Sequence, residues 1–160
     1  MTIPAKSVMT TDIVTVPPDT TVAETARRML IHHVSAVPVV DLGNRPLGLV
    51  SEGDVMRYFG AQFQSKRAQW LRMLAEGEKL APEFLAEIRL NQRHVREIMS
   101  TAIVSADEEA SLAELADLML KHGIKRVPIL RDGVLVGMVS RADVIRAVVE
   151  NLDDLLEPTD

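Results

Sequence analysis

Two short stretches of the chain carry the residues best able to do chemistry. "GLVSEGD" spans residues 48–54 and "GMVSRAD" spans residues 137–143, and each places Asp three positions after Ser and Arg three positions after Asp. A serine hydroxyl can donate to a phosphate oxygen, and a carboxylate can accept hydrogen bonds from two neighbouring sugar hydroxyls. The same two side chains can instead cap the start of a helix. Both interpretations stay open, and one does not exclude the other.

Ser51 and Ser140 each stand where an apolar, strand-like run gives way to a helical pattern. The first amides of a helix have no internal partners and its dipole favours negative charge, so a phosphate binds well at such a point. Asp is shorter than the Glu24 and Glu114 of two other cap-like motifs, and we expect it to reach back to the backbone less well. This difference favours a ligand role for at least one of the two Asp residues.

Composition restricts the class of protein. The 160 residues are 47% hydrophobic and 26% charged, which is typical of a globular chain, and they include no cysteine, which excludes disulfides and thiolate chemistry. We see no apolar run long enough to span a membrane and no secretory signal, so we expect a cytoplasmic protein without a membrane partner. The four histidines have no metal-binding spacing and no catalytic constellation is visible, so neither a metal site nor an enzyme is expected.

The formal net charge of −5 is concentrated at one end of the chain. Five acids account for it: Glu150, Asp153, Asp154, Glu157 and Asp160. The rest of the chain is balanced in charge, and this argues against a nucleic-acid partner.

The chain contains an internal repeat with a period near ninety residues. "VMTTDIVTV" (8–16) aligns with "IMSTAIVSA" (98–106), "HHVSAVPVV" (32–40) with "HGIKRVPIL" (122–130), and "GLVSEGDV" (48–55) with "GMVSRADV" (137–144). Each copy is expected to form a strand, a helix, two strands and a second helix. Thr21 and Ser111 with the acids three positions later predict capping boxes at the first helices, and Asp132-Gly133 predicts a hairpin turn.

Together these motifs resemble a tandem pair of cystathionine-β-synthase (CBS) domains, also called a Bateman module. The resemblance implies an α/β (α+β) fold of two βαββα units packed pseudo-symmetrically through their sheets. The expected divisions are repeat 1 at residues 1–59, a helical insert or linker at 60–93, repeat 2 at 94–150 and an acidic tail at 151–160. It also implies clefts for adenosine-containing ligands such as AMP, ADP, ATP or S-adenosylmethionine, with no obligatory cofactor.

Carried over by position, the resemblance assigns ribose to Asp54 and Asp143, and ribose or phosphate to Ser51 and Ser140. The adenine would lie between two apolar walls. One wall comprises Ile13, Val14, Ile103 and Val104, and the other comprises Val37, Pro38, Val127 and Pro128. The two prolines lack an amide donor and suggest a strand edge or break, so a purely architectural role is equally open.

The two repeats differ in charge near the expected sites. Lys125 and Arg126 precede Val127-Pro128, and Arg141 follows Ser140. The corresponding positions of the first repeat hold Ser35, Ala36 and Glu52. In the family that the chain resembles, basic residues before Val-Pro contact phosphates, so the resemblance implies that the second repeat binds phosphate better. The three basic residues can also be plain surface charges.

The favoured function is a regulatory module that senses an adenosine ligand in clefts between the repeats and transmits its state to a partner. The resemblance also implies a homodimer. All five aromatic residues lie within 58–84, so the 60–93 insert either covers its own domain or binds an effector protein. The alternative function is a protein-interaction or oligomerisation scaffold with vestigial nucleotide clefts.

Overall fold

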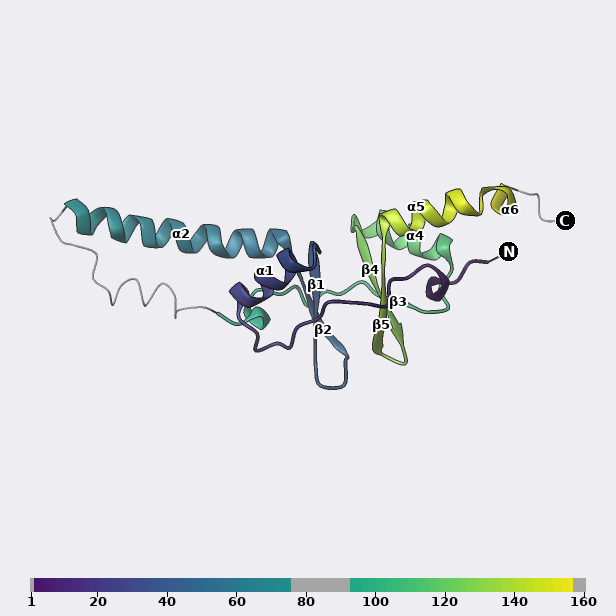
Figure 1. Cartoon of the computed structure of the whole chain (residues 1–160), viewed down its shortest axis with the longest axis horizontal. Helices are drawn as coiled ribbons and strands as arrows, with labels where there is room; N and C mark the ends of the chain where they lie inside the picture. The colour runs from purple at the N-terminus through teal and green to yellow at the C-terminus, as the bar shows by residue number, and fades with distance from the viewer. Residues whose placement is uncertain (1, 76–92, 157–160) are drawn as a thin grey trace. The chain divides into compact units, whose positions relative to one another are not determined.

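The computed structural model describes residues 2–75 and 93–156, apart from the side chains of residues 62, 63, 65–74 and 155 (Figure 1). The chain divides into two compact units. The second-repeat unit comprises Met1–Ile13, Leu42–Pro46 and Ala102–Asp160, and the first-repeat unit comprises Val14–Asp41 and Leu47–Thr101. Each unit thus combines most of one repeat with the first residues of the other repeat.

The second-repeat unit has the predicted βαββα order. It contains β3 (Ala106–Asp107), α4 (Leu112–His122), β4 (Arg126–Arg131), β5 (Val134–Ser140) and α5 (Arg141–Glu150). Strand β4 is central, parallel to β3 and antiparallel to β5. A short helix, α6 (Leu152–Leu156), begins the acidic tail.

The first-repeat unit has the same order with a shorter first strand. It contains α1 (Val22–Ile31), β1 (Ala36–Val40), β2 (Pro46–Ser51) and α2 (Glu52–Ala75). Strands β1 and β2 form a two-stranded sheet, and the expected first strand is reduced to a parallel bridge from Val16 to Val39. The two small sheets with their helices confirm the α+β class, while the packing of the repeats through their sheets stays a prediction.

Local sequence signals explain where the elements begin. Ser111 and Glu114 form a complete capping box at α4, whereas Thr21 at α1 only accepts the Glu24 amide, at 3.1 Å. Asp132 and Gly133 adopt φ angles of 52° and 79°, as a tight hairpin turn between β4 and β5 requires.

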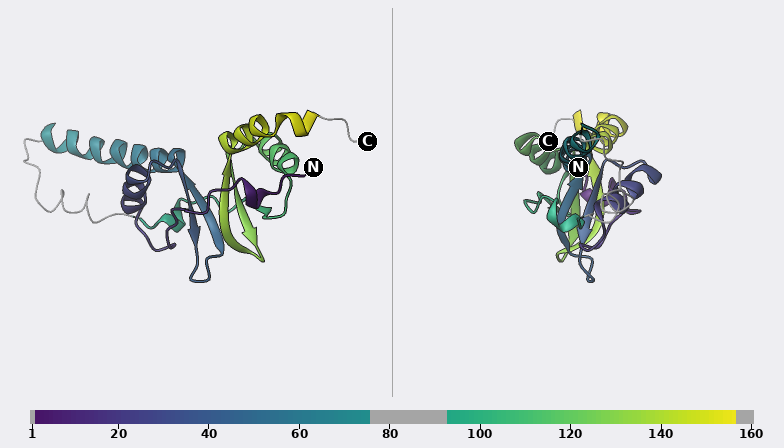
Figure 2. Two further views of the ribbon diagram at one scale, coloured as in Figure 1. Left: turned by 45° about the vertical axis from the view of Figure 1, so that its right-hand side comes forward. Right: turned by 90° about the vertical axis from the view of Figure 1, so that its left-hand side faces the viewer.

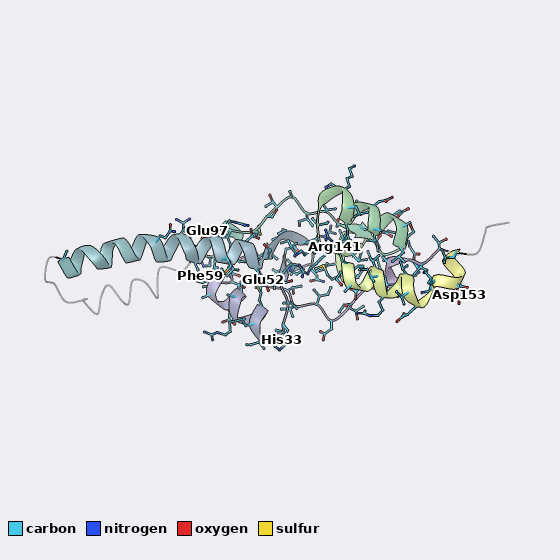
Figure 3. The ribbon with its side chains drawn as sticks, turned by 90° about the horizontal axis from the view of Figure 1, so that it is seen from above. His33, Glu52, Phe59, Glu97, Arg141 and Asp153 are labelled. Carbon is cyan, nitrogen blue, oxygen red and sulfur yellow. The ribbon has the colours of Figure 1, made fainter. Side chains whose placement is uncertain are left out.

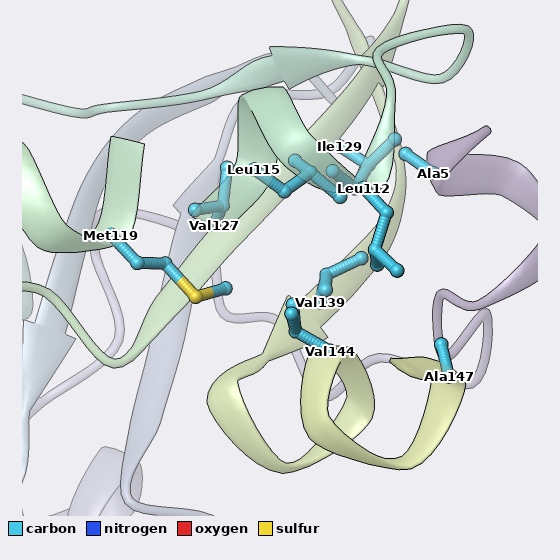
Figure 4. Packing of buried hydrophobic residues seen from close by; sticks show 9 residues of the cluster. All are labelled: Ala5, Leu112, Leu115, Met119, Val127, Ile129, Val139, Val144 and Ala147. Carbon is cyan, nitrogen blue, oxygen red and sulfur yellow. The ribbon is translucent and has the colours of Figure 1, made fainter. Parts of the chain in front are cut away.

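Each unit has an aliphatic core built from its sheet and its helices. In the second-repeat unit, Leu115 of α4 and Ile129 of β4 are fully buried, and Figure 4 shows them among the apolar side chains of α4, β4, β5 and α5. In the first-repeat unit, Val16, Val37 and Val50 are fully buried. Leu30 of α1 and Leu120 of α4 lie outside these cores, because they are 77% and 79% exposed.

The N-terminal segment of each repeat packs on the unit of the other repeat. The short 3-10 helix η1 (Ala5–Ser7) docks on the loop before α4, where the Ala5 amide donates to the Ala110 carbonyl at 2.7 Å. The equivalent helix η2 (Val95–Glu97) docks before α1, where the Val95 amide donates to the Thr20 carbonyl at 2.7 Å. The N-terminal segments of the two repeats are therefore exchanged.

The exchange extends to the outer edges of β5 and β2. Thr10 and Met138 exchange two backbone hydrogen bonds of 2.9 and 3.0 Å. Ser100 and Leu49 exchange two of 2.9 Å. The preceding residues, Met9 and Met99, lie against Gly137 and Gly48, so each exchanged segment also packs its side chain on the strand.

The expectation that the prolines mark strand edges or breaks is wrong for Pro128, which lies inside the central strand β4. Pro128 stands opposite Met138, whose N–H and C=O both point outward to Thr10. In an antiparallel ladder, alternate residue pairs exchange no hydrogen bond, so proline loses no ladder bond to β5 at this place. Pro38 likewise lies inside β1, where its carbonyl accepts the Val16 amide at 3.1 Å.

Helix α2 runs continuously from the first repeat into the predicted insert, as Figure 1 shows. The interface role predicted for the insert rests on its aromatic residues, and the aromatic side chains beyond residue 60 lie outside what the structure describes. Within the described ranges, no helix is both long enough and apolar enough to cross a membrane.

Candidate functional site

Ser140 and Asp143 form a reciprocal pair at the start of α5. The Ser140 hydroxyl oxygen accepts the Asp143 amide at 3.2 Å, and Asp143 Oδ2 accepts the Ser140 amide at 2.9 Å. Ser140 is the N-cap of the helix, so the predicted capping role is present. The Asp143 carboxylate is 14% exposed and keeps a path to solvent.

Ser51 and Asp54 form the same pair at the start of α2. Asp54 Oδ2 accepts the Ser51 amide at 2.9 Å, and the Ser51 hydroxyl accepts the Asp54 amide at 3.3 Å. Our expectation that Asp reaches back poorly is therefore wrong for both copies. A short acid at this position reaches the backbone because the N-cap geometry brings the amide and the carboxylate close together.

The two carboxylates differ in how many donors they receive. Asp54 Oδ2 also accepts the Ser51 hydroxyl at 3.0 Å, whereas the described contacts of Asp143 include no such bond from Ser140. On the other oxygen, Asp54 Oδ1 accepts Arg57 Nη2 at 2.6 Å and Asp143 Oδ1 accepts Arg146 Nη1 at 3.1 Å. The carboxylate of the first repeat is thus the more fully occupied of the two.

The predicted basic residues of the second repeat gather beside Ser140. Arg126 of β4 pairs in register with Ser140 of β5, and the Arg141 amide donates to the Lys125 carbonyl at 3.0 Å. Arg141 Nε also donates to the Ile124 carbonyl at 3.0 Å, which holds its guanidinium over the loop before β4. The open end of the β4–β5 hairpin therefore brings the backbone of Lys125, Arg126 and Arg141 next to Ser140, one helical turn before Asp143.

The same place in the first-repeat unit has different chemistry. The Glu52 amide donates to the Ser35 carbonyl at 3.0 Å, which is the equivalent of the bond between Arg141 and Lys125. Figure 3 shows Glu52 and Arg141 at the first turns of α2 and α5. The backbone is conserved between the repeats while an acid replaces a base, so the local charge is reversed.

Comparison with known proteins agrees with this architecture. A family model described as "CBS domain" matches residues 5–61 and 95–150. The chain is a member of the CBS domain family. It is 34% identical over 138 residues to the CBS domain-containing protein YhcV of Bacillus subtilis, covering 86% of this chain and 80% of that protein.

Solved structures of CBS proteins share the fold. CBSX2 in complex with AMP matches with a TM-score of 0.67 and 21% identity over 92% of this chain and 96% of that one. The CBS domain pair of protein MJ0100, in complex with 5′-methylthioadenosine and S-adenosyl-L-methionine, matches with a TM-score of 0.67 and 18% identity over 94% and 99% of the two chains.

The residues predicted to form the adenine walls of this CBS pair fall into two groups. Ile13, Val14, Ile103 and Val104 are half-buried and precede the Val16 bridge and β3. The side chains of Val37 and Val127 are fully buried in the cores, and the prolines that follow them are also buried. Their role in binding adenine stays a prediction.

Sequence reasoning gave no role to two features of these CBS units. The arginines three residues after each aspartate were visible in the repeat, but only the fold reveals that they contact the carboxylates. The pairing of Thr10 with Met138 had no local signal, because a strand pattern does not say which sheet edge it joins.

Over the described residues, no group of three or more His, Cys, Asp or Glu side chains is placed to hold a metal ion.

Proposed function

We propose that this CBS pair is a regulatory module that binds an adenosine-containing ligand of the AMP, ADP, ATP or S-adenosylmethionine class. The observation that carries the proposal is the cluster at the open end of the β4–β5 hairpin. There Asp143 and Ser140 stand beside Lys125, Arg126 and Arg141. Similar folds occur in complexes with AMP and with S-adenosyl-L-methionine, and this supports the choice of ligand class.

The chemistry of the cluster suits a nucleotide. The Asp143 carboxylate accepts hydrogen bonds from the ribose hydroxyls, while Ser140 and the basic side chains stabilise a phosphate near the start of α5. Lys125 is exposed, so its flexible side chain can bring the ammonium to the phosphate. Arg126 and Arg141 add positive charge. A ligand without a phosphate uses the ribose contact and gains less from the three cations.

The second-repeat unit is proposed as the stronger phosphate site. In the first-repeat unit, Glu52 replaces Arg141 and its carboxylate repels a phosphate at the same position of the helix. Asp54 also has fewer open acceptor positions than Asp143, because the Ser51 hydroxyl donates to it. The first-repeat site is therefore either empty or occupied by a less anionic adenosine ligand.

Regulation requires that the ligand bind one conformation of the protein better than another. In this chain the ligand contacts the first turn of α5 and the loop before β4. Binding can therefore change the position of α5 relative to β4 and β5. A partner protein reads the resulting change, and the insert at 60–93 is the candidate surface for an effector.

We also propose that the helices mediate a homodimer. Leu120 on α4 and Ile145 and Val149 on α5 are 79%, 64% and 67% exposed. Figure 2 shows the two helices side by side on the second-repeat unit. Large exposed apolar side chains on adjacent helices are typical of an interaction surface, and this observation also favours the alternative function of an oligomerisation scaffold.

Thermal unfolding with a panel of AMP, ADP, ATP and S-adenosylmethionine tests the proposed function. A ligand at about 100 times its Kd adds roughly 2.7 kcal/mol, which is on the order of 5–10 °C for a chain of this size. We expect a shift with at least one ligand, lost in Asp143→Ala and retained in the matched control Asp54→Ala. Flat melting curves across the panel would favour the scaffold, and a shift lost only in Asp54→Ala would contradict the asymmetry.

A further inference from the structure

We propose that Arg146 is a positioning residue for the ribose contact, because it orients the Asp143 carboxylate and leaves its acceptor positions suited to a vicinal diol. The inference rests on the proposed function and concerns only how Asp143 is prepared for its ligand. It assigns no direct ligand contact to Arg146.

The argument begins with the geometry of the Asp143 side chain. Oδ2 accepts the Ser140 amide at 2.9 Å and Oδ1 accepts Arg146 Nη1 at 3.1 Å. One bond to each oxygen prevents rotation of the carboxylate about its last side-chain torsion. The orientation is thus fixed before a ligand arrives, and such preorganisation improves affinity by avoiding a loss of freedom on binding.

The number of open acceptor positions follows from the same contacts. An ionised carboxylate has about four lone-pair sites, two on each oxygen. At Asp143 each oxygen uses one site for the protein and keeps one. A vicinal diol presents two hydroxyl donors side by side, so it can donate one hydrogen bond to each oxygen.

The first-repeat carboxylate is occupied differently. Asp54 Oδ2 accepts both the amide and the hydroxyl of Ser51, at 2.9 and 3.0 Å, and Oδ1 accepts Arg57 at 2.6 Å. Only Oδ1 keeps an open position, so a diol can make one of its two hydrogen bonds there. Discrimination between ribose and deoxyribose is therefore a property of Asp143 and its arginine.

Arg146 contacts the Asp143 carboxylate and lies outside the hydrophobic core. Its side chain is 63% exposed, and it lies one turn after Asp143 on α5. Arg57 has the same position on α2 and is 73% exposed. The chain therefore offers a matched control that removes the same kind of ion pair from the other repeat.

The test is isothermal titration calorimetry of the full chain with AMP and with 2′-deoxy-AMP. A hydrogen bond to a charged group is worth a factor of about ten or more, so the wild type is expected to bind AMP at least about tenfold more tightly. In Arg146→Met we expect weaker AMP binding and a ratio reduced to about twofold, with the ratio partly restored in Arg146→Lys. Arg57→Met should keep the wild-type ratio.

The outcomes separate this inference from the function on which it rests. If the wild type binds neither nucleotide, the proposed function fails and the inference fails with it. If the wild type binds AMP and Arg146→Met keeps its ratio, or binds AMP more tightly, only the positioning role is overturned. A ratio that collapses in Arg57→Met also overturns it. Unliganded melting curves of all variants verify that the fold is intact.

Discussion

The Met9 side chain occupies the space that a β-carbon on Gly137 would need, with its Sδ and Cγ nearest to that position. Met99 stands in the same relation to Gly48, at 2.5 Å. Because the two contacts are equivalent in the repeat, they mark the place where each exchanged segment crosses a strand. A β-carbon at either position would force the methionine to shift, so glycine allows the close approach of the two chain segments.

We expect Gly137→Ala to destabilise the protein, because the added methyl group would displace Met9 from β5. Overpacking of this kind typically costs about 1–3 kcal/mol. Gly60→Ala is the matched control, since Gly60 lies in α2 with nothing within 4 Å of an added β-carbon. Alanine there should stabilise by roughly 0.5–1 kcal/mol. Urea unfolding of the two variants decides the matter, and equal stabilities would refute the steric account.

A second prediction separates capping from ligand binding. Ser111 caps α4 with Glu114, and Ser140 caps α5 with Asp143. Replacing either serine by alanine should lower the free energy of unfolding by about 1 kcal/mol. Only Ser140→Ala should also weaken nucleotide binding in calorimetry. Unchanged affinity in Ser140→Ala would mean that this hydroxyl serves the helix alone.

A third prediction concerns pH. The Arg131 guanidinium donates to both oxygens of Glu108, at 2.7 and 2.8 Å, and this hydrogen bonding lowers the pKa of Glu108 below its ordinary value of 4.5. A carboxyl with a depressed folded-state pKa stabilises the fold above its unfolded pKa, and that contribution disappears as pH falls through the folded value. Lys6 also faces Glu108 and lowers its pKa further.

The measurement compares unfolding of the wild type and Arg131→Gln at pH 6 and at pH 3. Loss of stability on acidification should be smaller in the variant, because its Glu108 has a more ordinary pKa. Arg27→Gln provides a control, since Arg27 and Glu24 are 3.8 Å apart on α1, far from ideal hydrogen-bond geometry. If Arg131→Gln and the wild type lose equal stability, the ion pair has no role in the acid transition.

A fourth prediction addresses the proposed homodimer. Ile145→Lys and Val149→Lys place charges on the exposed face of α5 and should convert a dimer into a monomer with little change in the core. Light scattering after size exclusion gives the mass directly. Lys substitution at Leu42, which lies in the β1–β2 turn and is fully exposed, should leave the mass unchanged. A monomeric wild type, or dimeric α5 variants, would exclude this surface.

A fifth prediction tests the turn that joins β1 to β2. Asn44 has a φ of 59°, and its side-chain amide donates to the Leu135 carbonyl at 2.8 Å while its own carbonyl accepts the Leu135 amide at 3.0 Å. Asn44→Ala loses the side-chain bond and strains the backbone, so we expect a loss of about 1–3 kcal/mol in chemical unfolding. Asn44→Gly relieves the strain and should lose less; an equal loss would assign the whole effect to the hydrogen bond.

The sequence predicted the parts of the structure that depend on neighbouring residues. The caps at Ser111 and Ser140, the turn at Asp132-Gly133 and the order of helices and strands follow from local spacing. It did not predict that Leu30 and Leu120 are exposed, because helical periodicity defines a stripe and says nothing of how much of it the sheet covers. Pro128 fits in a central strand because the backbone N–H and C=O of Met138, its partner on β5, point away from it. Sequence alone does not reveal this register.

The residues of the candidate site were predicted from the sequence, but the difference between its two copies was not. Repeat alignment brought Ser140, Asp143 and the basic residues into one hypothesis, and the fold places them at one end of a hairpin. The extra hydrogen bond from the Ser51 hydroxyl to Asp54 Oδ2 distinguishes the first repeat, although both repeats have the same Ser and Asp. Such a difference arises only in three dimensions, so residue identity could not reveal it.

The exchange of the N-terminal segments has a consequence for synthesis on the ribosome. Residues 14–101 contain all of the first-repeat unit, so this unit can close as soon as residue 101 has left the exit tunnel. Residues 2–13 are made before residue 101, but they must wait for the loop before α4 and for β5, which are made after it. Residues 2–13 therefore stay unpaired until β5 has been made. A substitution in these residues would destabilise the unit that is formed by the C-terminal half.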